Sequence, residues 1–341
     1  MDAHTVRLPR CSLSSVIGWV TAKKTELIFN NNKRVPEKKY QQFIDHRNLL
    51  YKKVKSSYYA LREINFHIEY LKRNLEILHE YKQLATIYFS NGEGIMSDVI
   101  RVDIMLDNMQ TDLKLREQQL IPMEVAFNHL LNRPSTKELN IYDELDKEES
   151  LLLFMDASIS EYHPKLKIAE LDTQLSDEKE AMVMKNSLPQ MSIGLDYMLI
   201  NERTDVDVVG NGKDAFMPMV SFSLPLHRKK NKALKRQAIL EKEASKFQET
   251  NMRNELLDSY ERHSYNQLHA FEKINLYENQ IDKTNQLIRL LYTAYSNTGN
   301  DFEDVLNLQQ QLLKYEMAKI TSLKEFYISS SELEYLRAKN E

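Results

Sequence analysis

The chain carries one long pattern twice. Residues 89–100 (FSNGEGIMSDVI) and 295–306 (YSNTGNDFEDVL) each interrupt a helical run, and Asp304 follows Asp98 by 206 residues. At the same offset and without a gap, apolar positions coincide, among them Leu50 with Leu256, Ile68 with Ile274, Leu106 with Leu312 and Phe127 with Leu333. A period of this length indicates a duplicated helical hairpin and not a solenoid repeat, because one unit already contains several elements.

Composition favours long exposed helices. Of 341 residues, 28% are charged and 42% are hydrophobic, and seven Gly with eight Pro are too few for a compact fold with many turns. A net charge of −4 provides no basic field, so we expect no nucleic-acid partner. No stretch approaches the roughly 20 apolar residues of a membrane helix, and a single Cys11 excludes an intrachain disulfide.

Apolar residues at three- and four-residue steps predict five helices. Their expected ranges are about 36–88, 95–131, 164–186, 231–296 and 302–338. We expect Pro122 to kink the second helix and Asn132-Arg133-Pro134 to end it. Residues 133–162 are expected to form a linker or equatorial segment, with one small element near 151–155.

Two runs show the alternation of strands. In 189–200 and 216–225, every second residue is apolar, and each run has the length of a tilted membrane-spanning strand. A strand pair cannot lie alone in hydrocarbon, because its edge N–H and C=O groups need partners, so a membrane strand pair implies a closed barrel. An ordinary soluble hairpin packed on the helices explains the same alternation.

The order of these features resembles the TolC-type outer-membrane efflux proteins. The resemblance covers about residues 16–338 and rests on the strand at Leu188-Pro189, the strand ending in Pro225, the basic helix start, the Tyr295-Ser-x-x-Gly299 turn and Asp304-Val-Leu306. It implies a mainly α fold of long antiparallel helical hairpins in two repeats, with a transmembrane β-hairpin inserted. It also implies a homotrimeric tunnel through the periplasm and outer membrane that exports drugs or metal ions.

The same resemblance implies partners and sites. The partners are a periplasmic adaptor, an inner-membrane pump and outer-membrane lipid. The two turns would contact the adaptor through Ser90, Asn91, Gly92, Ser296, Asn297 and Gly299. Asp98 and Asp304 are aperture candidates that a threefold assembly would gather into a carboxylate ring, or they are acidic residues that stabilise helix starts. The second acidic position of the family is Arg101 or Asn307 here.

Mapping the repeats onto the chain divides it into four parts. Residues 1–24 are a remnant of the first-repeat strand region, 25–132 the first helical hairpin, 133–162 the linker, and 163–341 the second repeat, whose helical hairpin is 226–338. The offset places Val220–Leu226 on Ser14–Val20, so we expect the chain to be N-terminally truncated relative to the family's pattern.

The remaining signals are weaker. A basic run (His227, Arg228, Lys229, Lys230, Lys232, Lys235 and Arg236) either meets anionic lipid or is a solvated face. Methionines in or beside the strands suit Cu(I), but they suit a lipid-facing surface as well. No residue pattern indicates catalysis, a cofactor or a metal site, so we expect no enzyme. The alternative function is a cytosolic coiled-coil scaffold without transport activity.

Overall fold

The structure is a computed structural model that describes residues 12–15, 22–139, 163–198, 209, 212–226, 228–298 and 302–338. The chain forms two compact units. Unit 1 comprises residues 1–43 and 164–253, and unit 2 comprises residues 44–163 and 254–341. The small element expected at 151–155 lies outside the described residues.

The described residues form five long helices, which correspond to the five that apolar periodicity predicts. They are α1 (Ala22–Ser90), α2 (Met96–Leu130), α4 (Pro164–Asn186), α5 (Arg228–Thr298) and α6 (Phe302–Arg337). None of the described helices has a stretch long and apolar enough to cross a membrane. The mainly α fold class is therefore confirmed.

The expected start of the first helix at Pro36 is wrong. The helix α1 begins at Ala22 and continues through Pro36. A proline inside a helix removes one backbone donor, but residues 22–35 contain no Gly or further Pro that would end the helix before it. The helix α2 likewise continues through Pro122.

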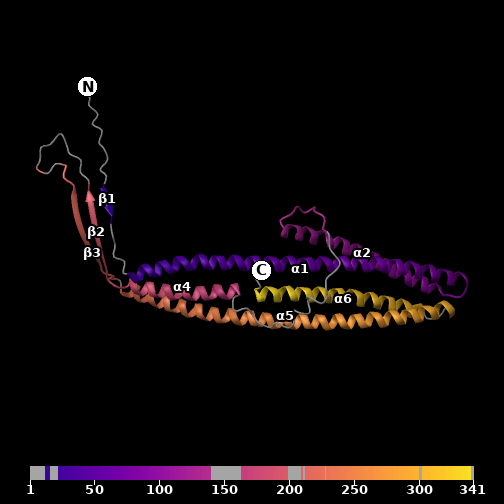
Figure 1. The fold of residues 1–341 in the computed structure, drawn as a ribbon. Coiled ribbons are helices and arrows are strands. Elements are labelled where there is room, and N and C mark those ends of the chain that lie inside the picture. The colour runs from indigo at the N-terminus through magenta and orange to yellow at the C-terminus, as the bar shows by residue number, and fades with distance from the viewer. Residues whose placement is uncertain are drawn as a thin grey trace, which may run out of the picture. The chain divides into compact units, whose positions relative to one another are not determined.

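The helix starts repeat at the offset of the sequence duplication. The helix α5 begins at residue 228 and α1 at residue 22, while α6 begins at residue 302 and α2 at residue 96, so both pairs are 206 residues apart. In unit 2, α2 folds back along the end of α1, and α6 folds back along the end of α5 (Figure 1). Each helical hairpin thus has its turn at an equivalent sequence position.

The strands form one antiparallel sheet in unit 1 with the order β1-β2-β3. Strands β2 (Gln190–Met198) and β3 (Ala215–Ser223) are the two predicted strands, and Ile193 lies opposite Val220. Strand β1 (Ser12–Ser15) lies within residues 1–24, where a first-repeat strand region is expected, and it pairs with the other edge of β2, with Ser14 opposite Asp196. The 206-residue offset maps β1 onto residues 218–221 of β3.

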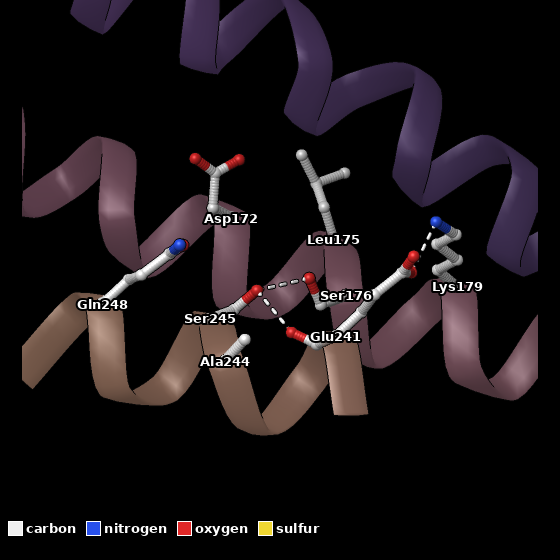
Figure 2. Close-up of a pocket in the computed structure, with 8 residues that line it drawn as sticks. All are labelled: Asp172, Leu175, Ser176, Lys179, Glu241, Ala244, Ser245 and Gln248. Carbon is white, nitrogen blue, oxygen red and sulfur yellow. Dashed lines mark hydrogen bonds and ion pairs between the residues drawn. The ribbon is translucent and has the colours of Figure 1, made fainter. Parts of the chain in front are cut away.

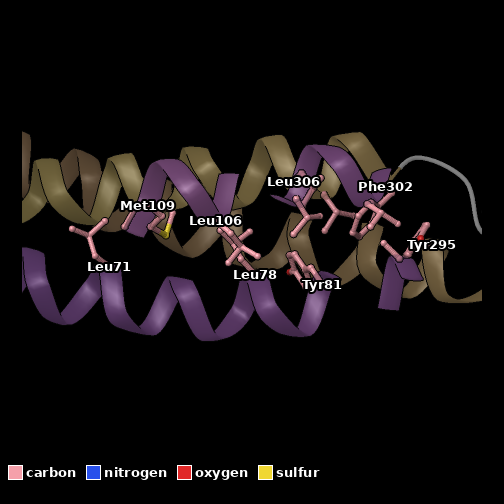
Figure 3. Packing of buried hydrophobic residues seen from close by; sticks show 13 residues of the cluster. Leu71, Leu78, Tyr81, Leu106, Met109, Tyr295, Phe302 and Leu306 are labelled. Carbon is pink, nitrogen blue, oxygen red and sulfur yellow. The ribbon is translucent and has the colours of Figure 1, made fainter. Parts of the chain in front are cut away.

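The main hydrophobic core of unit 2 lies where the two helical hairpins meet (Figure 3). Its buried members come from α1, α2, α5 and α6: Leu71, Leu78, Tyr81, Ala85, Val99, Val102, Leu106, Met109, Tyr295, Phe302, Val305, Leu306 and Leu313. This core holds the ends of both hairpins side by side.

Buried polar pairs interrupt the apolar packing of unit 2. Gln309 donates a 2.9 Å hydrogen bond to Asn74, Gln267 donates a 2.8 Å bond to Ser330, and the Tyr335 hydroxyl donates a 2.6 Å bond to Asp45. A buried polar group without its partner is costly, so each pair favours one register of the helices.

Candidate functional site

The first hairpin turn is built on two glycines. Gly92 has a φ of +78°, a conformation in which a side chain is strained. Gly94 is needed for a different reason, because a Cβ there would lie 3.0 Å from the Tyr88 Cβ. The amides of Glu93 and Gly94 both donate to the Tyr88 carbonyl at 3.0 Å, which ends α1 in the manner of a glycine C-cap.

The predicted turn residues of this hairpin are accessible. Ser90, Asn91 and Gly92 are all exposed, and the Ser90 hydroxyl donates a 2.8 Å hydrogen bond to the Ile87 carbonyl. In the second hairpin, Ser296 and Asn297 lie in the last turn of α5. The predicted Gly299 lies outside the described residues.

Aromatic side chains bring the two hairpin ends together. The Tyr295 ring lies 5.0 Å from the Tyr88 ring and stacks on the Phe302 ring at 4.5 Å, measured between centroids. The Tyr81 ring packs edge-on against Phe302 at 6.1 Å. Residues 88 and 295 are therefore neighbours.

The first turn also presents apolar side chains that periodicity did not single out. Phe89, Ile95 and Met96 are exposed on and beside the turn. Ile95 is the extended N-cap residue of α2, and it makes no side-chain capping bond. The turn is therefore an exposed apolar surface that is available to a partner.

Asp98 is buried in the first turn of α2. Burial raises the pKa of its carboxyl group, the Arg101 guanidinium lowers that pKa, and the Glu303 carboxylate raises it. Arg101 in turn forms a 2.5 Å ion pair with Glu303 of α6. No sequence pattern indicated Glu303, because its partner Arg101 stood out only as a departure from the family's acidic residue.

Tyr295 shares this environment. Burial is the main cause that raises the pKa of its hydroxyl to about 12, and the nearby Asp98 and Tyr88 side chains raise it further. The hydroxyl oxygen has no hydrogen-bond partner among the described residues. A neutral phenol therefore lies beside the buried carboxyl group of Asp98.

Asp304 is exposed, unlike Asp98, although the duplication makes the two positions equivalent. The helix α6 buries Phe302, Val305 and Leu306, so its residue 304 points away from the core. The helix α2 buries Asp98 and Val99 instead. Both aspartates lie in the first turn of a helix, where a negative charge is favourable.

The strand pair in unit 1 has two distinct faces. On one face, Met191 lies opposite Phe222 and Ile193 opposite Val220, and all four side chains are exposed. The alternate positions place Ser192 opposite Ser221 on the other face. One face of the hairpin is therefore an exposed apolar surface, and the other carries Ser221 together with the exposed Met217 and Met219.

A hollow of about 350 Å³ lies between α4 and α5 in unit 1 (Figure 2). Lys179 forms a 2.6 Å ion pair with Glu241 there, and the Ser176 and Ser245 hydroxyls lie 2.8 Å apart. Asp172 pairs with Lys38 at 2.5 Å. Because its charged groups already pair with one another or with α1, the hollow offers no free charge to a ligand. Within the described part of the chain, no group of three His, Cys, Asp or Glu could hold a metal ion.

Comparison with protein-family models and with curated proteins finds no match. Solved structures do match. The outer-membrane channel OprN is 15% identical, with a TM-score of 0.81 over 96% of this chain and 75% of its own. The outer membrane protein VceC from Vibrio cholerae is 11% identical, with a TM-score of 0.80 over 97% and 85%.

CusC, a protein whose folding and transmembrane channel formation have been described, gives a TM-score of 0.83 at 11% identity, over 96% of this chain and 76% of its own. All three matches extend over nearly the whole described chain. The protein therefore has the fold of these outer-membrane channel proteins, which is the fold that its resemblance to the TolC-type family predicts.

Proposed function

We propose that this protein is the outer-membrane channel component of a tripartite efflux pump. Three copies form a tunnel through the periplasm and outer membrane that exports drugs or metal ions, and the protein works as a conduit and not as an enzyme. The observation that carries this proposal is the likeness to OprN, VceC and CusC over nearly the whole chain, helices and strands included. A cytosolic coiled-coil scaffold would have no use for the strand pair.

The strand pair supports the membrane assignment by its two faces. The exposed apolar face, which includes Ile193, Val220 and Phe222, suits contact with lipid. The other face, which carries serines and glycine beside Met217 and Met219, is the more polar of the two and suits a water-filled lumen. The outer edge of β3 has no partner strand among the described residues, and strands of further copies would complete the barrel.

The experiment places a charge on each face of β3 in the full-length protein. Phe222→Arg should cost about 2–4 kcal/mol of assembly free energy if the side chain faces the bilayer midplane. Ser223→Arg, one residue on, is the matched control and should leave assembly intact. The measurement is the amount of trimer in the outer-membrane fraction. Equal amounts for the two variants would refute the lipid-facing assignment.

The exposed turn supports docking of a periplasmic adaptor, which in turn engages an inner-membrane pump. Phe89, Ile95 and Met96 supply apolar area, and Ser90 and Asn91 supply polar groups at its rim. Ser90→Arg should abolish crosslinking to the adaptor without loss of helicity. Thr111→Arg, at an exposed position further along α2, is the control and should crosslink normally. Normal crosslinking of Ser90→Arg would show that the turn is not part of the interface with the adaptor.

Asp98 and Asp304 remain aperture candidates in the trimer. A ring of carboxylates would attract cations, so Asp98→Asn combined with Asp304→Asn should weaken cation selectivity of the reconstituted channel. The exposed Asp304 is the better placed of the two for this role. If single-channel recordings give the same selectivity for variant and parent, neither aspartate lines the aperture.

A further inference from the structure

The first turns of α5 form the most strongly charged segment of unit 1. Six cations fall within residues 228–236, which we call the basic segment, and the next acidic residue is Glu241. Five of the six are exposed: Arg228, Lys229, Lys230, Lys232 and Arg236. A solvated helix face usually mixes both signs, so this segment needs its own explanation.

The acidic side chains packed nearby are already neutralised. Lys242 pairs with Asp177 at 2.9 Å and with Glu180 at 3.0 Å. Arg34 of α1 pairs with Glu178 of α4, and Lys179 pairs with Glu241. Among the described residues, no ion pair joins the basic segment to an acid. Its positive charge is therefore available to a partner outside the chain.

The position of the basic segment on its helix is electrostatically unfavourable. The N-terminus of a helix carries the positive end of the macrodipole, and cations there destabilise the helix. No acidic residue lies in the first turn of α5 to offset this. An external anion would relieve the repulsion between the lysines and also the repulsion from the helix end.

The chain changes abruptly from apolar to basic at this point. Leu224 and Leu226 follow β3, with 65% and 81% of their side-chain area exposed, and Arg228 comes two residues later. Leu188, at the start of the other strand, is exposed as well. The duplication repeats the pattern, because Lys23-Lys24 occupies in α1 the position of Lys229-Lys230 in α5.

We propose that the basic segment binds the anionic headgroups of the membrane leaflet at which the strands end and the helices begin. The inference rests on the proposed function, since it takes the strands to lie in the bilayer. The exposed leucines meet the acyl chains, and the lysine and arginine side chains donate to lipid phosphate oxygens. The segment thereby fixes the depth at which the strand pair sits in the membrane.

The test compares the binding of the full-length protein to vesicles of phosphatidylcholine with and without phosphatidylglycerol. Lys229→Gln, Lys230→Gln and Lys232→Gln are combined in one variant. Each lost cation should weaken partitioning onto anionic vesicles about fivefold, so the triple variant should bind on the order of 100-fold more weakly. Its binding to neutral vesicles should not change, and high salt should remove the difference.

The control combines Lys246→Gln, Arg253→Gln and Lys283→Gln, which are exposed cations further along α5 and lower the net charge by the same amount. It should bind anionic vesicles within about twofold of the parent. Equal loss in both variants would show a non-specific charge effect and overturn the proposal.

Two further outcomes separate the proposals. If the parent protein binds both kinds of vesicle equally, the basic segment does not recognise anionic headgroups, and this inference fails while the proposed membrane function is unaffected. If the parent binds neither kind, the proposed function fails together with the inference. Suppression of the lipid preference by inorganic phosphate at constant ionic strength would indicate a free-phosphate site and would also overturn the proposal.

Discussion

Leu78 is the position at which the core between the hairpins can be tested most directly. Its side chain is fully buried, and it packs within the cluster shown in Figure 3. Leu78→Ala removes three carbons, which is about 2.4 kcal/mol of transfer free energy at ~0.8 kcal/mol per carbon. The cavity left behind raises the expected cost to about 3–4 kcal/mol.

Leu290→Ala in α5 is the matched control. That side chain is 68% exposed in the chain, so only about a third of the transfer term, roughly 0.8 kcal/mol, is at stake and no cavity forms. Both variants delete the same atoms from long helices. The difference between them therefore measures burial.

Hydrogen exchange is the appropriate assay, because a chain of two units need not unfold in one step. Amides of α1 around residue 78 should exchange on the order of several hundred-fold faster in Leu78→Ala, if exchange follows the local opening equilibrium. Leu290→Ala should change exchange near residue 290 less than about fivefold. Similar acceleration in both variants would show that the hairpin ends do not share the core described here.

Three other features, the turn glycines, the buried Gln309–Asn74 pair and Asp98, give predictions with definite expected results. Gly92→Ala should lower the free energy of unfolding by about 1 kcal/mol, because residue 92 has a positive φ. Gly94→Ala should lower it more, because the added Cβ would press on the end of α1. The midpoints of thermal unfolding would rank the two variants. Gln309→Leu should cost about 1–3 kcal/mol by leaving the Asn74 carbonyl oxygen unpaired, and adding Asn74→Leu should recover part of it in denaturant unfolding. Asp98→Asn should stabilise the protein at neutral pH and lose that advantage in acid.

The sign of the Asp98 effect follows from the direction of its shift. Burial raises the pKa of the carboxyl group, so the folded state holds the proton more tightly than the unfolded state does. Stability therefore falls as the pH rises from the unfolded value of about 3.9 through the folded pKa. Asp304→Asn, at an exposed carboxylate, is the control. A lower melting temperature for Asp98→Asn at neutral pH would show that its charge stabilises the helix start.

Much of the fold could be predicted because its signals are local. The helix Pro164–Asn186 begins at a proline and ends before a strand whose alternation is plain, and the structure gives it those bounds. The start of α1 could not be placed in this way, because the proline rule marks Pro36 as a first helical residue while the helix continues through it. Strand β1 is only four residues long, so the 206-residue offset indicated a strand region there but no local alternation could give its bounds.

The candidate site was less predictable. Gly92 could be assigned to a turn from its neighbours, and the structure gives it the positive φ that such a turn requires. Burial of Asp98 depends on which face of α2 meets the other helices, and periodicity gives the spacing of a face but not its direction. The Arg101–Glu303 pair joins two helices that are distant in sequence, so it becomes visible only when they are packed.

The unequal burial of the two repeats bears on how copies would assemble. The helix α6 buries seventeen residues within the chain and α2 only seven, although the two helices derive from one duplicated pattern. Ile100 is 49% exposed on α2, whereas its equivalent Leu306 is 3% exposed on α6. Ile104, one helical turn from Ile100, is 55% exposed as well, so α2 presents an exposed apolar stripe of the kind that marks an interaction surface. In the proposed trimer, a neighbouring copy would cover α2 as the chain itself covers α6. The same apolar face would then be buried within the chain in one repeat and between copies in the other.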